Sequence, residues 1–105
     1  EYDGFAEVLT LIDALEGCLV STIHAESDEE MVPALVSALM RVSGRIVWNG
    51  WPTGVAVTGA QHHGGPYPTA TSALHTSVGT TAMRRFQRPV AFQSMPLHLL
   101  PPALQ

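Results

Sequence analysis

From Ile46 to Met83 the chain contains no Asp, Glu, Lys or Arg, and Gly, Pro and aromatic residues recur along the whole segment. No run in it approaches the roughly 20 consecutive apolar residues that a membrane helix needs. Its apolar residues also argue against disorder, which combines low hydrophobicity with high charge. The segment is therefore predicted to be ordered coil, which is uncommon beyond about 12 to 15 residues unless it is functional. We expect it to line a site or to lie against further protein.

The charged residues divide along the chain: all nine acids lie in residues 1–30, and all five basic residues are arginines from Arg41 onwards. The net charge of −4 argues against general binding of nucleic acid, and no stretch predicts association with a membrane. The single cysteine, Cys18, favours a reducing compartment, so we expect a cytoplasmic protein. A length of 105 residues suits one domain. Because Glu1 is neither an initiator Met nor the start of a signal peptide, we expect the sequence to begin within a longer chain.

A strand, a helix and a second strand are predicted in the first half of the chain. Residues 19–24 and 45–48 have strand composition. Between them, Ser27 and Glu30 have capping-box spacing, and apolar residues recur every three or four positions until a glycine, Gly44, follows the helix. Pro33 is expected either to kink this helix or to mark where it properly begins. The order and spacing predict a parallel βαβ unit and an α/β fold.

Further elements are predicted at both ends. The aliphatic run at residues 6–12 has the length and composition of a strand. Residues 81–87 predict a short helix that Pro89 ends. Residues 88–94 have strand composition with this proline near the start, which is typical of an edge strand. The tail, residues 95–105, is expected to lie as a short amphipathic turn on a neighbour.

Four groups of residues allow a functional role beside a structural one. Five histidines could suggest a metal, but no acid or Cys lies near the adjacent pair, so structural roles are favoured; they are His24, His62, His63, His75 and His98. Parts of the sequence resemble a hydrolase with Ser77 as nucleophile, but no acid follows residue 30 to complete a triad. Cys18 lies beside Glu16 and is expected to be an inert core thiol. A cluster of three arginines could meet a phosphate or carboxylate, but a role at a helix end or subunit contact is favoured; they are Arg84, Arg85 and Arg88.

The loop that leaves the strand at residues 45–48 is the candidate binding element. In parallel sheets such loops build the binding crevice. Asn49 offers an amide at the strand end, neighbouring glycines allow close backbone approach, and Trp51, Pro52 and Tyr67 could wall a pocket. From these residues alone, a pocket and a merely stable loop are equally supported. The chain has no phosphate-binding loop and no dinucleotide fingerprint.

Three blocks of the sequence resemble a known family. They are GRIVWNGWPTGV, HGGPYP and SVGTTAMRRFQRPVAFQ. In this order and spacing they resemble the carboxyl-terminal end of an aldehyde dehydrogenase, most closely a 2-oxoglutarate semialdehyde (2,5-dioxopentanoate) dehydrogenase, and the likeness covers nearly the whole chain. Many aldehyde dehydrogenases carry a PFGG-x-K-x-S-G block where this sequence has HGGPYPTATSALHTS. The missing lysine makes the general aliphatic and betaine aldehyde subfamilies less similar.

The resemblance implies oxidation of an aldehyde with NAD or NADP, through a Cys thiolate, hydride transfer and a Glu-activated water. None of these groups, nor the nucleotide-binding fold, lies in the part that this chain matches, so the chain alone should be inactive. Residues 1–86 would be the end of the catalytic domain, and 87–105 an oligomerisation strand and tail. The partners implied are the rest of the chain, a small aldehyde and further copies in a homo-dimer or tetramer.

The resemblance also implies roles for single residues. Substrate-binding residues would lie on the loop along the substrate tunnel and on its far side: Asn49, Trp51, Pro52, Thr53, Gly54, His63 and Tyr67. The terminal strand would cross to the partner subunit through Arg88, Pro89, Val90, Ala91, Phe92 and Gln93. The alternative is a free-standing α/β interaction module that binds a partner through its edge strand and its uncharged loop.

Overall fold

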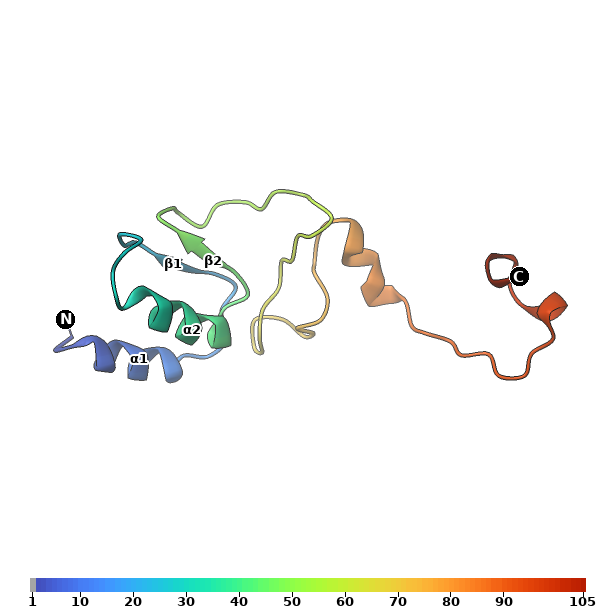
Figure 1. Ribbon diagram of the computed structural model, residues 1–105, viewed down its shortest axis with the longest axis horizontal. Helices are drawn as coiled ribbons and strands as arrows, with labels where there is room; N and C mark the ends of the chain where they lie inside the picture. The colour runs from blue at the N-terminus through green and yellow to red at the C-terminus, as the bar shows by residue number, and fades with distance from the viewer. Residues whose placement is uncertain (1) are drawn as a thin grey trace.

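The computed structural model describes residues 2–105. Two α-helices and two strands form its amino-terminal half, and short 3₁₀-helices follow (Figure 1). The elements are α1 (Phe5–Asp13), β1 (Ser21–Ile23), α2 (Val32–Val42), β2 (Ile46–Trp48), η1 (Thr80–Phe86), η2 (Leu97–Leu99) and η3 (Pro102–Leu104).

The strands β1 and β2 are parallel and are joined through α2, which confirms the predicted βαβ unit and the α/β class. Ser21 lies opposite Ile46, and Ile23 lies opposite Trp48. The pairing begins before the strands, because the Cys18 N–H donates to the Val42 carbonyl at 2.8 Å and the Gly44 N–H donates to the Cys18 carbonyl at 3.0 Å. The carboxyl ends of both strands therefore lie at one end of the sheet and their amino ends at the other.

Residues 6–12 form most of α1, so the predicted strand there is wrong. The apolar residues Phe5, Val8, Leu9 and Ile12 recur at intervals of three, one and three, which places them along one side of a helix. Ile12 is buried, and Val8 and Leu9 pack against the same cluster. The segment is thus helical despite its β-branched residues, because a helix buries its apolar residues on one continuous face.

Helix α2 begins at Val32 with Pro33 in its first turn, so the second of the two outcomes expected for this proline is confirmed. The capping box predicted from Ser27 and Glu30 does not form, because Met31 is the N-cap and no side chain caps the helix. Instead the Glu26 N–H donates to the Glu29 carboxylate at 2.8 Å in the turn before the helix. A proline suits this first turn because its missing N–H would have no helical partner there.

Gly44 does not form a left-handed helix cap. Ser43 is the C-cap with extended backbone (φ −120°, ψ 140°), and among the described glycines only Gly79 has a φ in the left-handed region. Gly44 is needed for another reason: a Cβ on it would lie 1.6 Å from the Gly64 carbonyl oxygen. The glycine therefore allows the loop at residues 61–79 to lie directly against the end of α2.

The core is small and lies between the sheet, α2 and α1, with α2 in the middle (Figure 1). Its buried apolar residues are Ile12, Ile23, Ala38 and Leu39. An ion pair between Arg41 and Asp13 joins the carboxyl ends of the two helices. Both side chains are more than half exposed, so this pair contributes at most about 1 kcal/mol.

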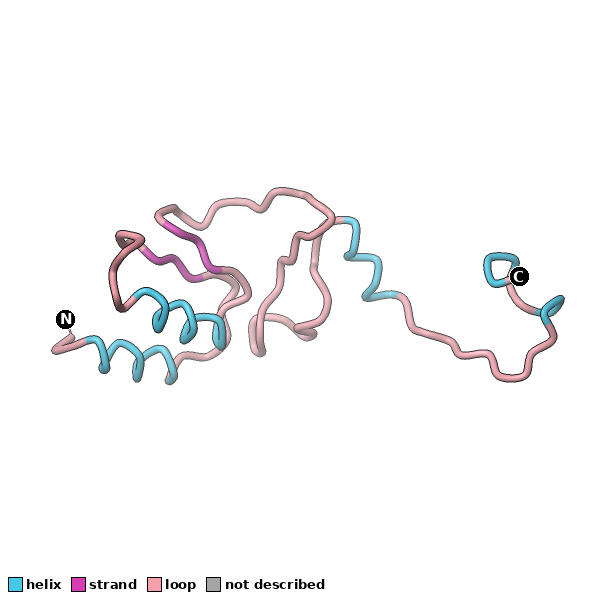
Figure 2. The backbone as a smooth tube through the Cα atoms, in the orientation of Figure 1, coloured by secondary structure: helices cyan, strands magenta, loops and turns pink. Residues whose placement is uncertain are grey.

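Residues 49–79 contain neither helix nor strand, which confirms the predicted coil (Figure 2). Its second half folds back on itself. The His63 N–H donates to the hydroxyl of Thr76 at 2.8 Å, and the Ser77 N–H donates to the His63 carbonyl at 2.9 Å. Thr76 is buried (3% exposed) and also donates to the Val78 carbonyl. This loop is ordered by its own polar contacts.

From η1 onwards the chain leaves the body and runs away from it (Figure 1). The short helix predicted at residues 81–87 is present as the 3₁₀-helix η1, whereas residues 88–94 pair with no other strand in the described chain. The radius of gyration is 20.0 Å, against about 13 Å for a compact domain of this length. Among the described residues, no helix is long and apolar enough to cross a bilayer.

Candidate functional site

Asn49 holds the carboxyl ends of the two strands together. Its Oδ1 accepts from the Ala25 N–H at 3.0 Å, and its Nδ2 donates to the Ala25 carbonyl at 2.8 Å. Its own N–H donates to the Ile23 carbonyl at 2.8 Å, and its φ of 44° turns the chain out of β2. Asn adopts this left-handed conformation more readily than most residues. The side chain thus fixes the start of the loop by bonding to backbone.

We predict that Asn49→Ala destabilises the protein by about 2 kcal/mol, since the two hydrogen bonds to the backbone of Ala25 are lost. The measurement is the free energy of unfolding in urea. Asn49→Gly is the matched control, because glycine keeps the left-handed backbone and removes only the side chain. If the alanine variant is as stable as the wild type, the bonds to Ala25 do not hold the strand ends.

The residues after Asn49 form an exposed turn. Trp51 is 81% exposed, and its ring centroid lies 5.8 Å from that of His24 with the planes tilted by 58°. The Thr53 carbonyl accepts from the Arg45 guanidinium at 3.0 Å, which ties the turn back to the start of β2. Pro52 and Gly54 lie in this same exposed turn. The predicted loop residues are therefore together, on the carboxyl side of the sheet.

His63 and Tyr67 lie at the other end of the sheet. A Cβ on Gly17 would lie 2.5 Å from the carbonyl oxygens of Pro66 and Tyr67, and one on Gly65 would lie 2.9 Å from the Cys18 carbonyl oxygen. These contacts place residues 64–67 against the chain that enters β1. Tyr67 is 86% exposed. Within this chain, the seven predicted substrate-binding residues therefore form two groups at opposite ends of the strands.

His63 does line a cavity of about 280 Å³, together with residues that the sequence reasoning did not select. The full lining is Leu19, His63, Gly64, Thr69, Ala70, Thr71, Ser72, His75, Ser77 and Arg85. A signal for it exists in the sequence: hydroxyl residues and histidines are dense between residues 69 and 77, where no acid occurs. What the sequence does not show is that Arg85 from η1 joins them.

The alternative sites also have defined surroundings. The Ser72 hydroxyl, not that of Ser77, lies 2.9 Å from His75 Nδ1, and no carboxylate lines their cavity. Cys18 is half-buried, with its Sγ 3.3 Å from the Ser43 hydroxyl and 3.5 Å from that of Ser21. In residues 2–105, no three His, Cys, Asp or Glu side chains group as metal ligands would. This geometry supplies neither a Ser-His-acid triad nor a thiol paired with a cation.

No family model matches the chain. Curated proteins do: the alpha-ketoglutaric semialdehyde dehydrogenase 2 of Azospirillum brasilense is 45% identical over 100 residues, which are 94% of this chain and 19% of that protein. The resemblance to semialdehyde dehydrogenases is confirmed. The alpha-ketoglutaric semialdehyde dehydrogenase of Acinetobacter baylyi is 44% identical over 104 residues, which are 98% of this chain and 20% of that protein. The chain thus spans about a fifth of the length of the semialdehyde dehydrogenases that it matches.

Proposed function

We propose that this chain is the carboxyl-terminal part of an NAD(P)-dependent dehydrogenase that oxidises 2-oxoglutarate semialdehyde to the carboxylic acid. The observation that carries the proposal is the identity of 44 and 45% to two semialdehyde dehydrogenases along almost the entire chain. The alpha-ketoglutaric semialdehyde in the names of these two relatives is a synonym of 2-oxoglutarate semialdehyde. On this proposal the catalytic thiolate, the general base and the cofactor site belong to the rest of the protein.

The exposed apolar surface supports a chain that packs against more protein. Large apolar side chains are mostly exposed on three separate parts of the chain: Trp51, Tyr67, Leu74 and Phe86 are each more than four-fifths exposed. Only four apolar residues of the described chain are buried, and the apolar residues packed against them are partly exposed. A free-standing interaction module would instead bury most of its large apolar residues in a core of its own.

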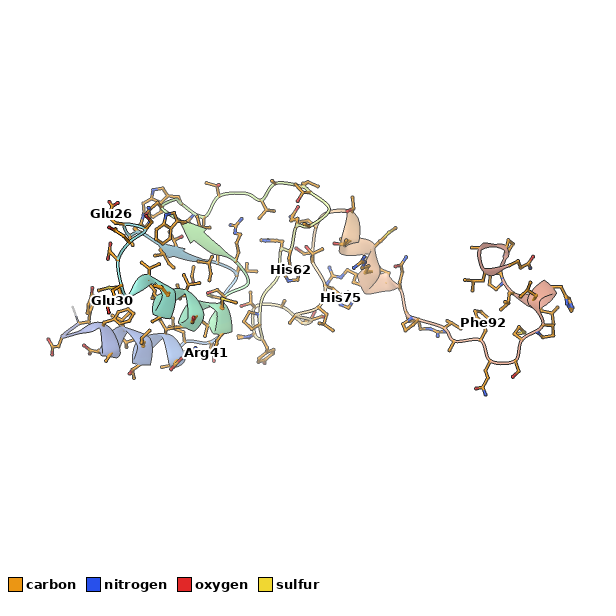
Figure 3. The ribbon with its side chains drawn as sticks, viewed as in Figure 1. Glu26, Glu30, Arg41, His62, His75 and Phe92 are labelled. Carbon is orange, nitrogen blue, oxygen red and sulfur yellow. The ribbon has the colours of Figure 1, made fainter. Side chains whose placement is uncertain are left out.

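The turn between β1 and α2 does not fit the pyrophosphate of a nicotinamide dinucleotide. In a nucleotide-binding fold, the turn between strand and helix is glycine-rich and the pyrophosphate lies at the helix N-terminus. Here the turn from β1 to α2 has no glycine and carries four carboxylates, Glu26, Asp28, Glu29 and Glu30. Glu26 and Glu30 are labelled in Figure 3. These carboxylates would repel a pyrophosphate, so NAD or NADP is proposed to bind elsewhere in the longer protein.

The roles proposed for single residues follow their positions. Trp51, Pro52, Thr53 and Gly54 would contribute one wall of the aldehyde tunnel from the carboxyl side of the sheet, with Asn49 holding that wall in place. His63 and Tyr67, at the opposite end, would reach the tunnel only if its far side extends there. Residues 1–86 would complete the catalytic domain, while 87–105 would join a second subunit through Arg88 to Gln93.

The experiment is to express the complete protein that carries this chain and to follow NADH or NADPH formation with 2-oxoglutarate semialdehyde as substrate. We expect turnover by the complete protein and none by residues 1–105 alone. Propanal and betaine aldehyde serve as comparison substrates, and we expect a lower kcat/KM for both. Absence of semialdehyde oxidation by the complete protein, with either cofactor, would refute the proposed function.

A further inference from the structure

The cavity described above lies between the loop at residues 61–79 and η1. One arm of this loop leads directly into η1, and His75 lies on that arm (Figure 3). Leu19, from the segment before β1, contributes an apolar side to the cavity. Leu19 and the continuous segment from His63 to Arg85 therefore meet around a space of about 280 Å³, enough for a small anion.

The walls of the cavity are set by hydrogen bonds before any ligand binds. The bonds of the His63 N–H to Thr76 and of the Ser77 N–H to the His63 carbonyl hold the two arms of the loop together. The Thr69 N–H donates to the Pro66 carbonyl at 2.9 Å and shapes the tip. A site formed in this way loses little conformational entropy when a ligand enters.

The polar side chains around the cavity can donate hydrogen bonds, and none of them is acidic. One guanidinium, two imidazoles and four hydroxyls line it, and no carboxylate does. Arginine is charged at every physiological pH, and its planar fork matches carboxylate and phosphate oxygens. The ion pair that the described chain contains is Arg41 with Asp13, away from this cavity. Within residues 2–105, Arg85 therefore has no anionic partner.

Further hydrogen-bonding groups surround the cavity. The hydroxyl-bearing residues Thr71 and Ser77 belong to its lining, whereas the Oγ1 of Thr69 is itself buried. The Ser72 Oγ lies 2.9 Å from His75 Nδ1. This contact occupies one nitrogen of the imidazole and leaves its Nε2 for another partner.

We propose that this cavity is a binding site for a small oxyanion, a carboxylate or a phosphate, held by the guanidinium of Arg85 together with hydroxyl groups of the cavity lining. Nothing assigns a ligand to these residues. The inference does not depend on the oxidation of an aldehyde, because it rests on the charge and donor content of the cavity. A pocket rich in donors and free of acids would favour an anion over a neutral or cationic ligand.

The test is calorimetric titration of the complete protein with inorganic phosphate and, separately, with malonate. We expect at least one of the two to bind, and Arg85→Gln to raise its dissociation constant at least about tenfold, since hydrogen bonds to a charged group contribute about 1.5 to 3 kcal/mol. Arg85→Lys keeps the charge and should recover part of the loss. Binding by phosphate alone or malonate alone identifies which source of oxyanion the site prefers.

Arg84→Gln is the matched control, because Arg84 neighbours Arg85 on η1, carries the same charge and does not line the cavity. We expect it to leave the dissociation constant within about twofold. Thermal unfolding of each variant separates a loss of binding from a loss of fold. The proposal is overturned if neither anion binds, or if Arg84→Gln weakens binding as much as Arg85→Gln does.

Discussion

Gly44→Ala is expected to destabilise the protein by about 3 kcal/mol or more, beyond the usual cost of overpacking. A Cβ at this position would lie 1.6 Å from the Gly64 carbonyl oxygen and 2.6 Å from its carbonyl carbon. Both obstacles are backbone atoms, which cannot rotate away as the end of a flexible side chain can. The loop must separate from α2, or the paired chain at Cys18 must shift. We would measure the midpoint of thermal unfolding of the complete protein.

The matched control is Gly59→Ala. No atom lies within 4 Å of a Cβ built at Gly59, and its φ is not in the left-handed region. This change should alter stability by less than about 1 kcal/mol, with a small gain if the unfolded chain loses freedom. A Gly44→Ala protein that unfolds at the wild-type temperature would mean that the loop at residues 61–79 does not lie against α2.

The βαβ unit was predictable because its main signals are local and agree with one another. The periodic apolar residues of α2 and the β-branched strands on either side of it favour the same arrangement, although the expected caps of the helix do not form. The prediction of a strand at residues 6–12 was wrong because a short aliphatic run is compatible both with a strand and with one side of a helix. Only packing against α2 decides between them, and the sequence does not show which partner such a run will meet.

The candidate site was predictable in part. The exposed turn at Trp51 follows β2, as expected for a loop at the carboxyl end of a parallel strand. The opposite position of His63 and Tyr67 depends on close backbone contacts at Gly17, Gly44 and Gly65, and such contacts leave no periodic pattern. The role of Gly44 shows the difficulty: a glycine after a helix usually indicates a left-handed cap, but here it makes room for another segment.

The segment at residues 88–94 supports a second prediction with a large effect. In the described chain, no backbone hydrogen bond joins residues 88–95 to any other segment. Val90 and Phe92 are exposed at 57% and 41%. An extended segment with free N–H and C=O groups can add to the edge of another sheet. We therefore expect it to pair with a second copy of the protein, as the proposed oligomerisation strand.

Pro89 indicates which side of this strand would pair. The N–H and C=O groups of alternate residues in a strand face the same side, and a proline in an edge strand lies where its missing N–H would face solvent. The backbone groups of residues 89, 91 and 93 should then face solvent, while the N–H and C=O groups of residues 88, 90 and 92 should bond to the partner. Two neighbouring proline substitutions therefore ought to have opposite effects on assembly.

Val90→Pro is expected to raise the dissociation constant of the oligomer at least about tenfold, because it removes a donor from the paired side and places a ring there. Ala91→Pro is the matched control: it introduces the same ring one residue along, on the side that faces solvent, and should leave assembly nearly unchanged. Sedimentation velocity of the complete protein over a range of concentrations measures both. Equal effects of the two variants would exclude a single paired edge. An oligomer that withstands Val90→Pro would show that residues 88–94 are not the segment that joins the subunits.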